Sequence, residues 1–438
     1  MPAHGTGRLE PVNSIDGALK QLSSAPYSSF FKTPFHRVAY GRNGFIEGSF
    51  AMTPGDFCPG SAFDVFYAAR EYISNDRLYL PRLYLYPEAR CQSRCKLCQF
   101  HSRHKQGGSL SKPALLEVMD KLADHRGGVI AQSLIVSGDG EPLIYPEIAN
   151  LLGIAAAREL RVFLTTNLLV DYRGHSGLYE KIPFSCDMVT VSIKGLTPSA
   201  YTEQQGLAGK RLFGRVLENL KHLSDIRRKE NPDMLLGVAS LVLPENSGEY
   251  LKMLRVFHDI GVDYVYFNQV EPSPEHWGIT FSEDEQAETL SEFALYAERP
   301  YRDMVVRCSA DPFRPRSGNS VYYDASALRE NPGICGSALF NPLVMSEGSS
   351  AQWFSCRNSS LFTDMRFRVR ELTADGMKPV MEAAAGCHDC RLERQVKHMD
   401  RIISIERLRS DVDYYLVFDT QKIETGGYAF IQFDEVVK

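Results

Sequence analysis

Between residues 80 and 280, short β-branched or apolar runs alternate with longer amphipathic stretches. The short runs predict six strands, at 82–87, 133–138, 162–167, 188–193, 237–243 and 264–270. The stretches between them have helical periodicity, as at 111–125, where Ser111 is a predicted N-cap and Pro113 lies in the first turn. Because strands separated by helices form parallel βαβ units, this alternation restricts the region to a parallel α/β sheet.

Six βα units are too few to close the usual eight-stranded barrel. We therefore expect an α/β fold, with a partial (β/α)6 TIM-like barrel and a small C-terminal α+β domain. The predicted division of the 438 residues is an N-terminal extension (1–80), the barrel (81–280), a helix and linker (281–330), the small domain (331–400) and a C-terminal β-hairpin tail (401–438). Within the small domain, residues 340–356 read as a hairpin.

The charge balance excludes several classes of partner. The chain has 49 Lys and Arg against 54 Asp and Glu, a net charge of −5, so no global basic field attracts nucleic acid or an anionic membrane. The first twenty residues lack the apolar core of a secretory signal, and no apolar run approaches the length of a membrane span. We therefore expect a cytoplasmic protein without a nucleic-acid or membrane partner.

Three of the ten cysteines follow directly on the first predicted strand: Cys91, Cys95 and Cys98. Working residues of parallel α/β sheets lie at the carboxyl ends of strands, so this is a candidate site. Zinc is one interpretation, with His101 or His104 as a fourth ligand. An iron–sulfur cluster is the other. A four-iron cluster held by three thiolates would leave one iron open to an external ligand.

The CxxxCxxC spacing in the loop after the first strand resembles the signature of the radical S-adenosylmethionine (radical SAM) superfamily. The resemblance implies a [4Fe–4S] cluster on Cys91, Cys95 and Cys98, with SAM bound at the open iron. In that family the reduced cluster cleaves SAM to a 5′-deoxyadenosyl radical, which takes a hydrogen atom from the substrate.

The segment after the second strand, "SGDGEP", resembles the GGEP motif of that family. Gly140, Glu141 and Pro142 match the motif, and Asp139 stands where the first glycine is usual. The role that the resemblance implies for these residues is capture of the SAM ammonium group. A carboxylate such as that of Glu141 is a suitable acceptor for a cation.

Later strand ends add further expected SAM contacts. Asn167, in "LTTN", resembles the residue that hydrogen-bonds the ribose hydroxyls, and Ser192, in "VSIKG", is a candidate for the SAM carboxylate or ribose. Lys194 replaces the usual acidic residue, and Gln205 stands where an arginine is common. Arg211 is a candidate cation for the SAM carboxylate and could equally be a surface arginine.

A second group of four cysteines lies after the barrel: Cys335, Cys356, Cys387 and Cys390. Four thiolates close a metal site, and spacing alone does not separate structural zinc from an iron–sulfur cluster. A hairpin between two cysteines, followed by CxxC, resembles the twitch domain, a shorter relative of SPASM. The resemblance implies one auxiliary [4Fe–4S] cluster with all four irons ligated by the protein, which suits electron transfer.

The leading functional hypothesis is a radical SAM oxidoreductase. It would act on a small polar metabolite or a peptide, take electrons from a reductant such as flavodoxin or ferredoxin, and pass the substrate electron to the auxiliary cluster. One alternative is a radical SAM epimerase with Cys308, just beyond the barrel strands, as the thiol hydrogen donor. Another alternative is a zinc-binding protein without catalytic activity.

Overall fold

The structure of the chain is a computed structural model. The residues that it describes are 78–80, 83–98, 108–122, 129–131, 133–158, 160–207, 211–268, 270, 279–301, 303–308, 313, 343–347, 349–354, 366–368, 413–418 and 431–436. Cys335, Cys356, Cys387 and Cys390 therefore lie outside the described residues, as do His101 and His104. Most of the predicted N-terminal extension lies outside them too.

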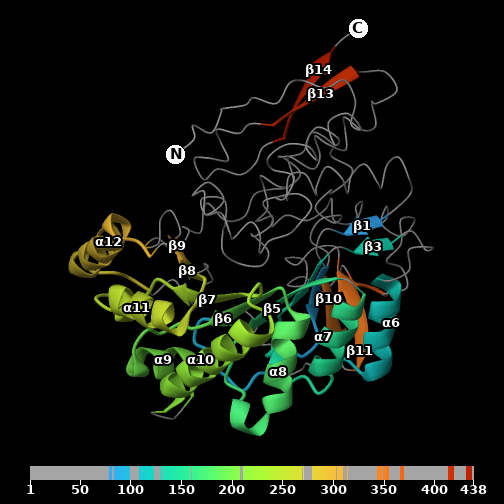
Figure 1. Cartoon of the computed structure of the whole chain (residues 1–438), viewed down its shortest axis with the longest axis horizontal. Coiled ribbons are helices and arrows are strands. Elements are labelled where there is room, and N and C mark those ends of the chain that lie inside the picture. Colours follow the sequence, from blue (N-terminus) through green and yellow to red (C-terminus); the bar gives the residue numbers. More distant parts are fainter. Residues whose placement is uncertain are drawn as a thin grey trace.

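A ten-stranded, mostly parallel sheet forms the centre of the described fold (Figure 1). In spatial order its strands are β12 (Arg366–Arg368), β11 (Ser350–Phe354), β10 (Leu343–Glu347), β2 (Leu83–Tyr86), β4 (Ser133–Val136), β5 (Arg161–Thr166), β6 (Met188–Ser192), β7 (Leu235–Leu241), β8 (Tyr264–Asn268) and β9 (Val305–Cys308). The six predicted barrel strands are confirmed as β2 and β4 to β8, all parallel to their neighbours. This agrees with a partial barrel.

Helices connect these strands and cover one face of the sheet (Figure 1). They are α6 (Lys112–Leu122), α7 (Ile148–Ala157), α8 (Ser176–Ser185), α9 (Pro198–Gln205), α10 (Leu212–Glu230), α11 (Tyr250–Ile260) and α12 (Glu283–Glu298), with short 3-10 turns η1 (Pro142–Ile144), η2 (Tyr172–Gly174) and η3 (Pro244–Asn246). The predicted cap of α6 is confirmed, since the backbone N–H of Ala114 donates to Ser111 Oγ at 3.3 Å. Among the described residues, no helix combines the length and apolarity needed to cross a bilayer.

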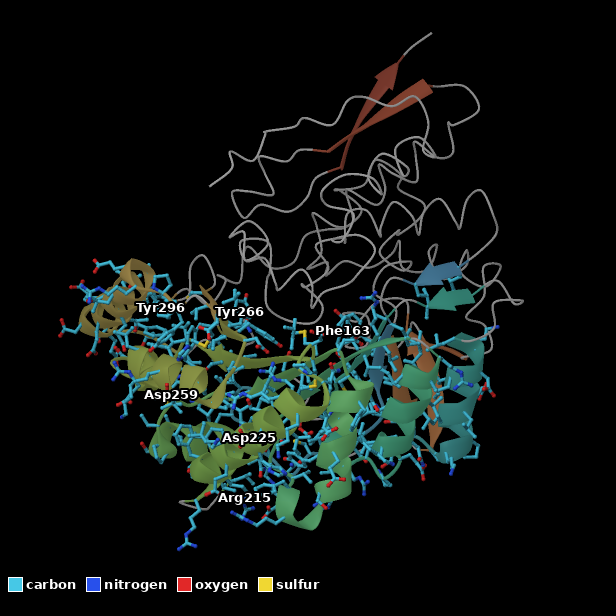
Figure 2. The ribbon with its side chains drawn as sticks, in the orientation of Figure 1. Phe163, Arg215, Asp225, Asp259, Tyr266 and Tyr296 are labelled. Carbon is cyan, nitrogen blue, oxygen red and sulfur yellow. The ribbon has the colours of Figure 1, made fainter. Side chains whose placement is uncertain are left out.

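Alternating side chains give the sheet two different faces. On β6, Val189 and Val191 belong to the core cluster that packs against the helices, so Thr190 and Ser192 face the other side, the lumen of the partial barrel. Thr190 Oγ1 and Tyr264 Oη are hydrogen-bonded across that face at 2.6 Å. Figure 2 shows Phe163 and Tyr266 on the side of the sheet away from α10.

The predicted hairpin at 340–356 is confirmed as β10 and β11, which pair antiparallel. Its position differs from the prediction, because β10 also pairs parallel with β2 and extends the barrel sheet instead of standing in a separate domain. Leu343, Val344 and Met345 are at most 1% exposed, which requires cover on both faces. A place beside a central parallel strand provides that cover.

Two smaller sheets complete the described structure. β1 (Leu78–Leu80) and β3 (Val129–Ala131) pair parallel. The predicted C-terminal hairpin is confirmed as β13 (Asp413–Phe418) and β14 (Ile431–Val436), which pair antiparallel.

Candidate active site

The three cysteines of the first group lie in the loop that follows β2, all partly buried and none in a disulfide. Burial raises the pKa of the Cys91 thiol to about 12, and nearby Glu141, Cys95 and Cys98 act in the same direction. The three sulfurs therefore share one neighbourhood. No three His, Cys, Asp or Glu side chains of the described residues converge as ligands of a single metal ion do. A four-iron cluster holds its ligands around a larger core.

An ion pair between a buried carboxylate and an exposed arginine fixes the two ends of this loop. Glu88 is fully buried, and Arg90 donates to its carboxylate through Nε and Nη2, both at 2.8 Å. Ser109, beyond the last cysteine, donates to the same carboxylate at 2.5 Å. Burial alone would raise the pKa of Glu88, but the hydrogen bonds from Arg90 and Ser109 outweigh it and lower the pKa. The carboxylate thus ties the start of the loop to its return.

The GEP segment lies directly against the cysteine loop. Glu141 is the N-cap of η1, where its side chain accepts from the N–H of Leu143, and Pro142 occupies the first position, which proline favours. The backbone N–H of Glu141 donates to the carbonyl of Arg90 at 2.9 Å. A Cβ on Gly140 would overlap the backbone carbonyls of Glu88 and Arg90, so only glycine allows this approach.

The carboxylate of Glu141 is only 2% exposed and faces donors of the chain itself. Its Oε1 accepts from the N–H of Leu143 at 2.9 Å and from Thr166 Oγ1 at 2.5 Å, and its Oε2 accepts from the N–H of Asn167 at 2.7 Å. Burial raises the pKa of Glu141 to about 6, although these hydrogen bonds oppose the shift. The carboxylate joins the ends of β4 and β5, and its contact with a SAM ammonium group stays a prediction.

Asn167 is also engaged with the cysteine loop. Its Oδ1 accepts from Gln92 Nε2 at 3.1 Å and from the N–H of Leu169 at 3.0 Å, while its Nδ2 donates to Cys91 Sγ at 3.7 Å. The side chain is 9% exposed. Its position at the end of β5 agrees with the sequence, and its expected bond to ribose stays a prediction.

The remaining expected SAM contacts lie at or near strand and helix ends. Ser192 ends β6 on the lumen face and is partly exposed. Lys194 follows it, and its carbonyl accepts from Asn246 Nδ2 at 2.9 Å. Arg211 precedes α10 and is exposed. These roles also stay predictions.

The end of α9 holds the cysteine loop from the other side, which the sequence reading missed. The backbone N–H groups of Arg94 and Lys96 donate to the carbonyls of Gln205 and Gln204, at 2.9 and 3.0 Å. Gly206 then ends α9 with φ +61°, in the left-handed region, and a Cβ there would overlap the carbonyl of Arg94. The one signal in the sequence was the glycine of "QQG", a residue type that often ends a helix.

Cys308 is the hydrogen-donor candidate of the epimerase alternative. It ends β9, and its partner in the parallel register is Phe267, a member of the core cluster on the helical side. Residues paired in register point to the same face, and Cys308 itself packs against that core cluster. Cys308 therefore lies on the helical side of the sheet, and its role as a hydrogen donor stays a prediction. Cys186 is buried in the same core cluster.

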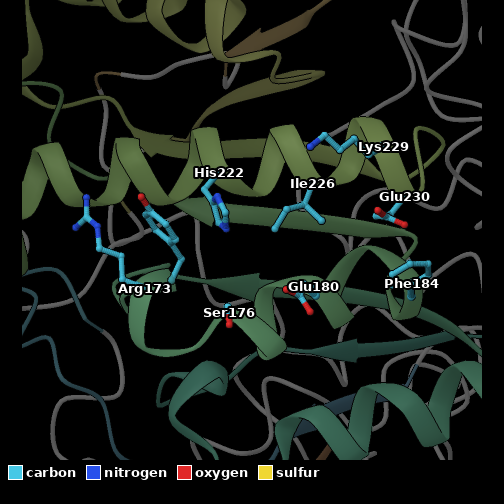
Figure 3. Close-up of a pocket in the computed structure, with 9 residues that line it drawn as sticks. Arg173, Ser176, Glu180, Phe184, His222, Ile226, Lys229 and Glu230 are labelled. Carbon is cyan, nitrogen blue, oxygen red and sulfur yellow. The ribbon is translucent and has the colours of Figure 1, made fainter.

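A hollow of about 520 Å³ lies on the outer surface between α8 and α10 (Figure 3). Its lining includes Glu180, Phe184, His222 and Lys229, which all belong to the helical layer. None of the predicted site residues lines it, so the candidate site remains the cysteine loop.

Comparison with known families identifies the barrel. Residues 86–257, which include the cysteine loop, the GEP segment and α9, match the family model of the Radical SAM superfamily. This segment, less than half of the chain, is similar to the radical SAM superfamily. That likeness implies a [4Fe–4S] cluster and SAM, and the residues present fit them, because one loop carries three soft thiol ligands.

Two curated relatives share this radical SAM segment. The dTDP-4-amino-4,6-dideoxy-D-glucose ammonia-lyase of Streptomyces venezuelae is 25% identical over 182 residues, covering 40% of this chain and 36% of that protein. The tungsten-containing aldehyde ferredoxin oxidoreductase cofactor-modifying protein of Pyrococcus furiosus is 25% identical over 197 residues, covering 44% of this chain and 52% of that protein. The aligned region thus spans about a third of the length of the first relative and about half of the length of the second.

Solved structures agree on the fold. Streptococcus suis SuiB bound to S-adenosylmethionine has a TM-score of 0.53 at 13% identity, covering 84% of this chain and 80% of that chain. SuiB bound to its precursor peptide SuiA has a TM-score of 0.51 at 13% identity, covering 77% of this chain and 79% of that chain. At this identity the likeness concerns the fold alone.

Proposed function

We propose that this chain is a radical SAM oxidoreductase that removes two electrons from a small polar metabolite or a peptide. The observation that carries the radical SAM part is the position of the cysteine loop. It lies at the carboxyl edge of the parallel sheet, braced by the segments that follow β4 and β5 and by the end of α9. Oxidation is the further step of the proposal, and the second cysteine group supports it.

The cluster and SAM, when bound, supply a 5′-deoxyadenosyl radical that takes a hydrogen atom from the substrate. The chain would supply three thiolates and a fixed loop to hold them. The hydrogen bonds from Arg90 to the Glu88 carboxylate keep that loop in place, and both groups belong to the chain itself. On the lumen face, the rings of Phe163 and Tyr266 are at most 9% exposed, and such apolar surface would keep water from a radical.

A two-electron oxidation requires a second electron acceptor. Hydrogen-atom transfer forms 5′-deoxyadenosine and leaves a substrate radical. Loss of a proton to a base and of one electron to the acceptor then completes the oxidation. We assign the acceptor to an auxiliary [4Fe–4S] cluster on the second cysteine group, because four thiolates ligate every iron and leave none open to substrate. A flavodoxin or ferredoxin would deliver the electron that starts the cycle.

Two kinds of substrate are compatible with the relatives. The name of one relative describes an ammonia-lyase of a nucleotide-linked amino sugar, and one similar solved structure holds a precursor peptide. These names concern those proteins. For this chain they support the two substrate classes already proposed.

The oxidation is tested by removing the second cluster alone. The double variant Cys387→Ala, Cys390→Ala, isolated without oxygen, should lose half of about eight iron atoms and still cleave SAM. With substrate it should form 5′-deoxyadenosine without oxidised product. Cys186→Ala removes a thiol from the helical core and is the matched control. Full product formation by a folded double variant would rule out the electron-acceptor role.

Metal content and SAM cleavage also distinguish the radical SAM enzyme from the zinc-binding alternative. A colourless wild-type protein with stoichiometric zinc and no SAM cleavage would contradict the enzyme assignment itself. Loss of stability and of SAM cleavage together in the double variant would instead assign a structural role to the second site.

A further inference from the structure

Two consecutive glutamines end α9, and both give a backbone carbonyl to the cysteine loop. Their side chains diverge. Gln205 Oε1 lies 3.0 Å from Cys95 Sγ, whereas Gln204 Nε2 lies 3.4 Å from Glu245 Oε1. Gln205 is 1% exposed and Gln204 4% exposed. One buried amide therefore contacts a predicted cluster ligand, and its neighbour provides a natural comparison.

The Gln205 side chain has little freedom to leave this position. Its backbone carbonyl is bonded to Arg94, next to Cys95, and Gly206 packs directly on the Arg94 carbonyl. These backbone contacts hold Gln205 beside Cys95, and burial of its side chain restricts the rotamers that it can adopt.

The partner of the amide must change when Cys95 becomes a metal ligand. In the structure the Cys95 thiol donates to Gln205 Oε1. A thiolate bound to iron has no proton to donate, so an amide oxygen facing it would be repelled. Rotating the amide by half a turn presents Nε2 instead, since the oxygen and the nitrogen occupy equivalent positions.

We propose that the side-chain amide of Gln205 donates a hydrogen bond to the Cys95 thiolate of the SAM-binding cluster and raises the reduction potential of that cluster. The inference rests on the cluster proposed for Cys91, Cys95 and Cys98. Reduction adds one electron to the cluster, and a donor at a ligand sulfur stabilises the added negative charge. Gln205 is a positioning and tuning residue, because it acts through Cys95.

The test compares Gln205→Leu with Gln204→Leu. Both variants keep the backbone carbonyls that bind the cysteine loop, and both replace a buried glutamine by the same residue. The proteins are reconstituted with iron and sulfide, and titrated with dithionite and mediators. The reduced cluster is followed by the electron paramagnetic resonance signal that changes when SAM is added, so that the auxiliary cluster is not counted.

At a potential near the wild-type midpoint, Gln205→Leu should lower the ratio of reduced to oxidised cluster about tenfold. For a one-electron couple this is a shift of about 59 mV. Gln204→Leu should stay within about twofold of wild type. In Gln205→Glu the new side chain has the same shape as glutamine, but it cannot donate a hydrogen bond when ionised and it adds a negative charge. This variant should therefore shift the reduction potential further in the same direction. It replaces Gln205→Leu in the test if that variant does not fold.

Equal midpoints for wild type, Gln204→Leu and the Gln205 variants, each with full iron content, would overturn the inference. Absence of any SAM-sensitive cluster signal in wild type and in Gln204→Leu would have a different meaning. That result would refute the proposed cluster, and with it the function.

Discussion

Gly206 joins α9 to the cysteine loop, and replacing it by alanine tests that junction. Its φ of +61° disfavours a side chain, at a cost of roughly 1–2 kcal/mol. The added Cβ would also overlap the Arg94 carbonyl, which is backbone held by Gln205 and cannot move cheaply. Overpacking of this kind costs about 1–3 kcal/mol more. We expect Gly206→Ala to lower the unfolding free energy by roughly 2–5 kcal/mol and to reduce iron uptake.

Gly261 provides the matched control. It ends α11 with φ +90°, in the same left-handed region, but a Cβ there meets the end of the Arg228 side chain instead of backbone. Gly261→Ala should therefore cost about 1–2 kcal/mol and leave the iron content normal. Urea unfolding of the metal-free proteins gives the free energies, and iron is counted after anaerobic reconstitution. If Gly206→Ala binds as much iron as Gly261→Ala, the junction does not position the cluster loop.

Three further predictions concern the same loop. Alanine at Cys91, Cys95 or Cys98 should abolish 5′-deoxyadenosine formation, measured by chromatography, and retained cleavage in all three variants would refute the ligand assignment. The lowered pKa of Glu88 means that its carboxylate stabilises the fold above its ordinary pKa of 4.5 and loses this effect as pH falls through the lowered value. For Glu88→Gln, the unfolding free energy of the chain without metal should therefore fall less steeply as the pH is lowered below 4.5. An unchanged pH dependence in this range would contradict the assignment. Asn167→Asp removes the donor to Cys91 and adds charge, so a chelator should extract iron roughly tenfold faster than from wild type.

Local sequence signals predicted the parts of the fold that depend on local physics. Strand periodicity identified β2 and β4 to β8, and the helix expected after residue 281 is α12, which the structure starts with a capping box at Ser282. The hairpin of β10 and β11 was also visible in the sequence. The pairing of β10 with β2 could not be predicted from the sequence. The choice of a parallel partner far away in the chain depends on burial of both faces of the strand, and it leaves no local sequence pattern.

The candidate site shows the same limit at the level of side chains. The motif placed Glu141 correctly at the end of β4, but the sequence could not show that backbone N–H groups occupy its carboxylate. Cys308 lies at a strand end, as expected, and a period of two residues decides the face on which it lies. Gln205 was noted only as a departure from a family pattern. Its contact with Cys95 joins residues far apart in sequence, which no single-residue rule predicts.

The pairing of β10 with β2 also has a consequence for biosynthesis. During translation, β2 emerges long before residues 343–347, at a synthesis rate of about 5–20 residues per second. For some tens of seconds one edge of β2, directly before the cysteine loop, would have no partner strand from this sheet. Exposed strand edges bind other chains, so a nascent or truncated polypeptide that ends before β10 should be prone to aggregate. The hairpin of β10 and β11 would therefore end the exposure of this edge only when synthesis of the chain is nearly complete.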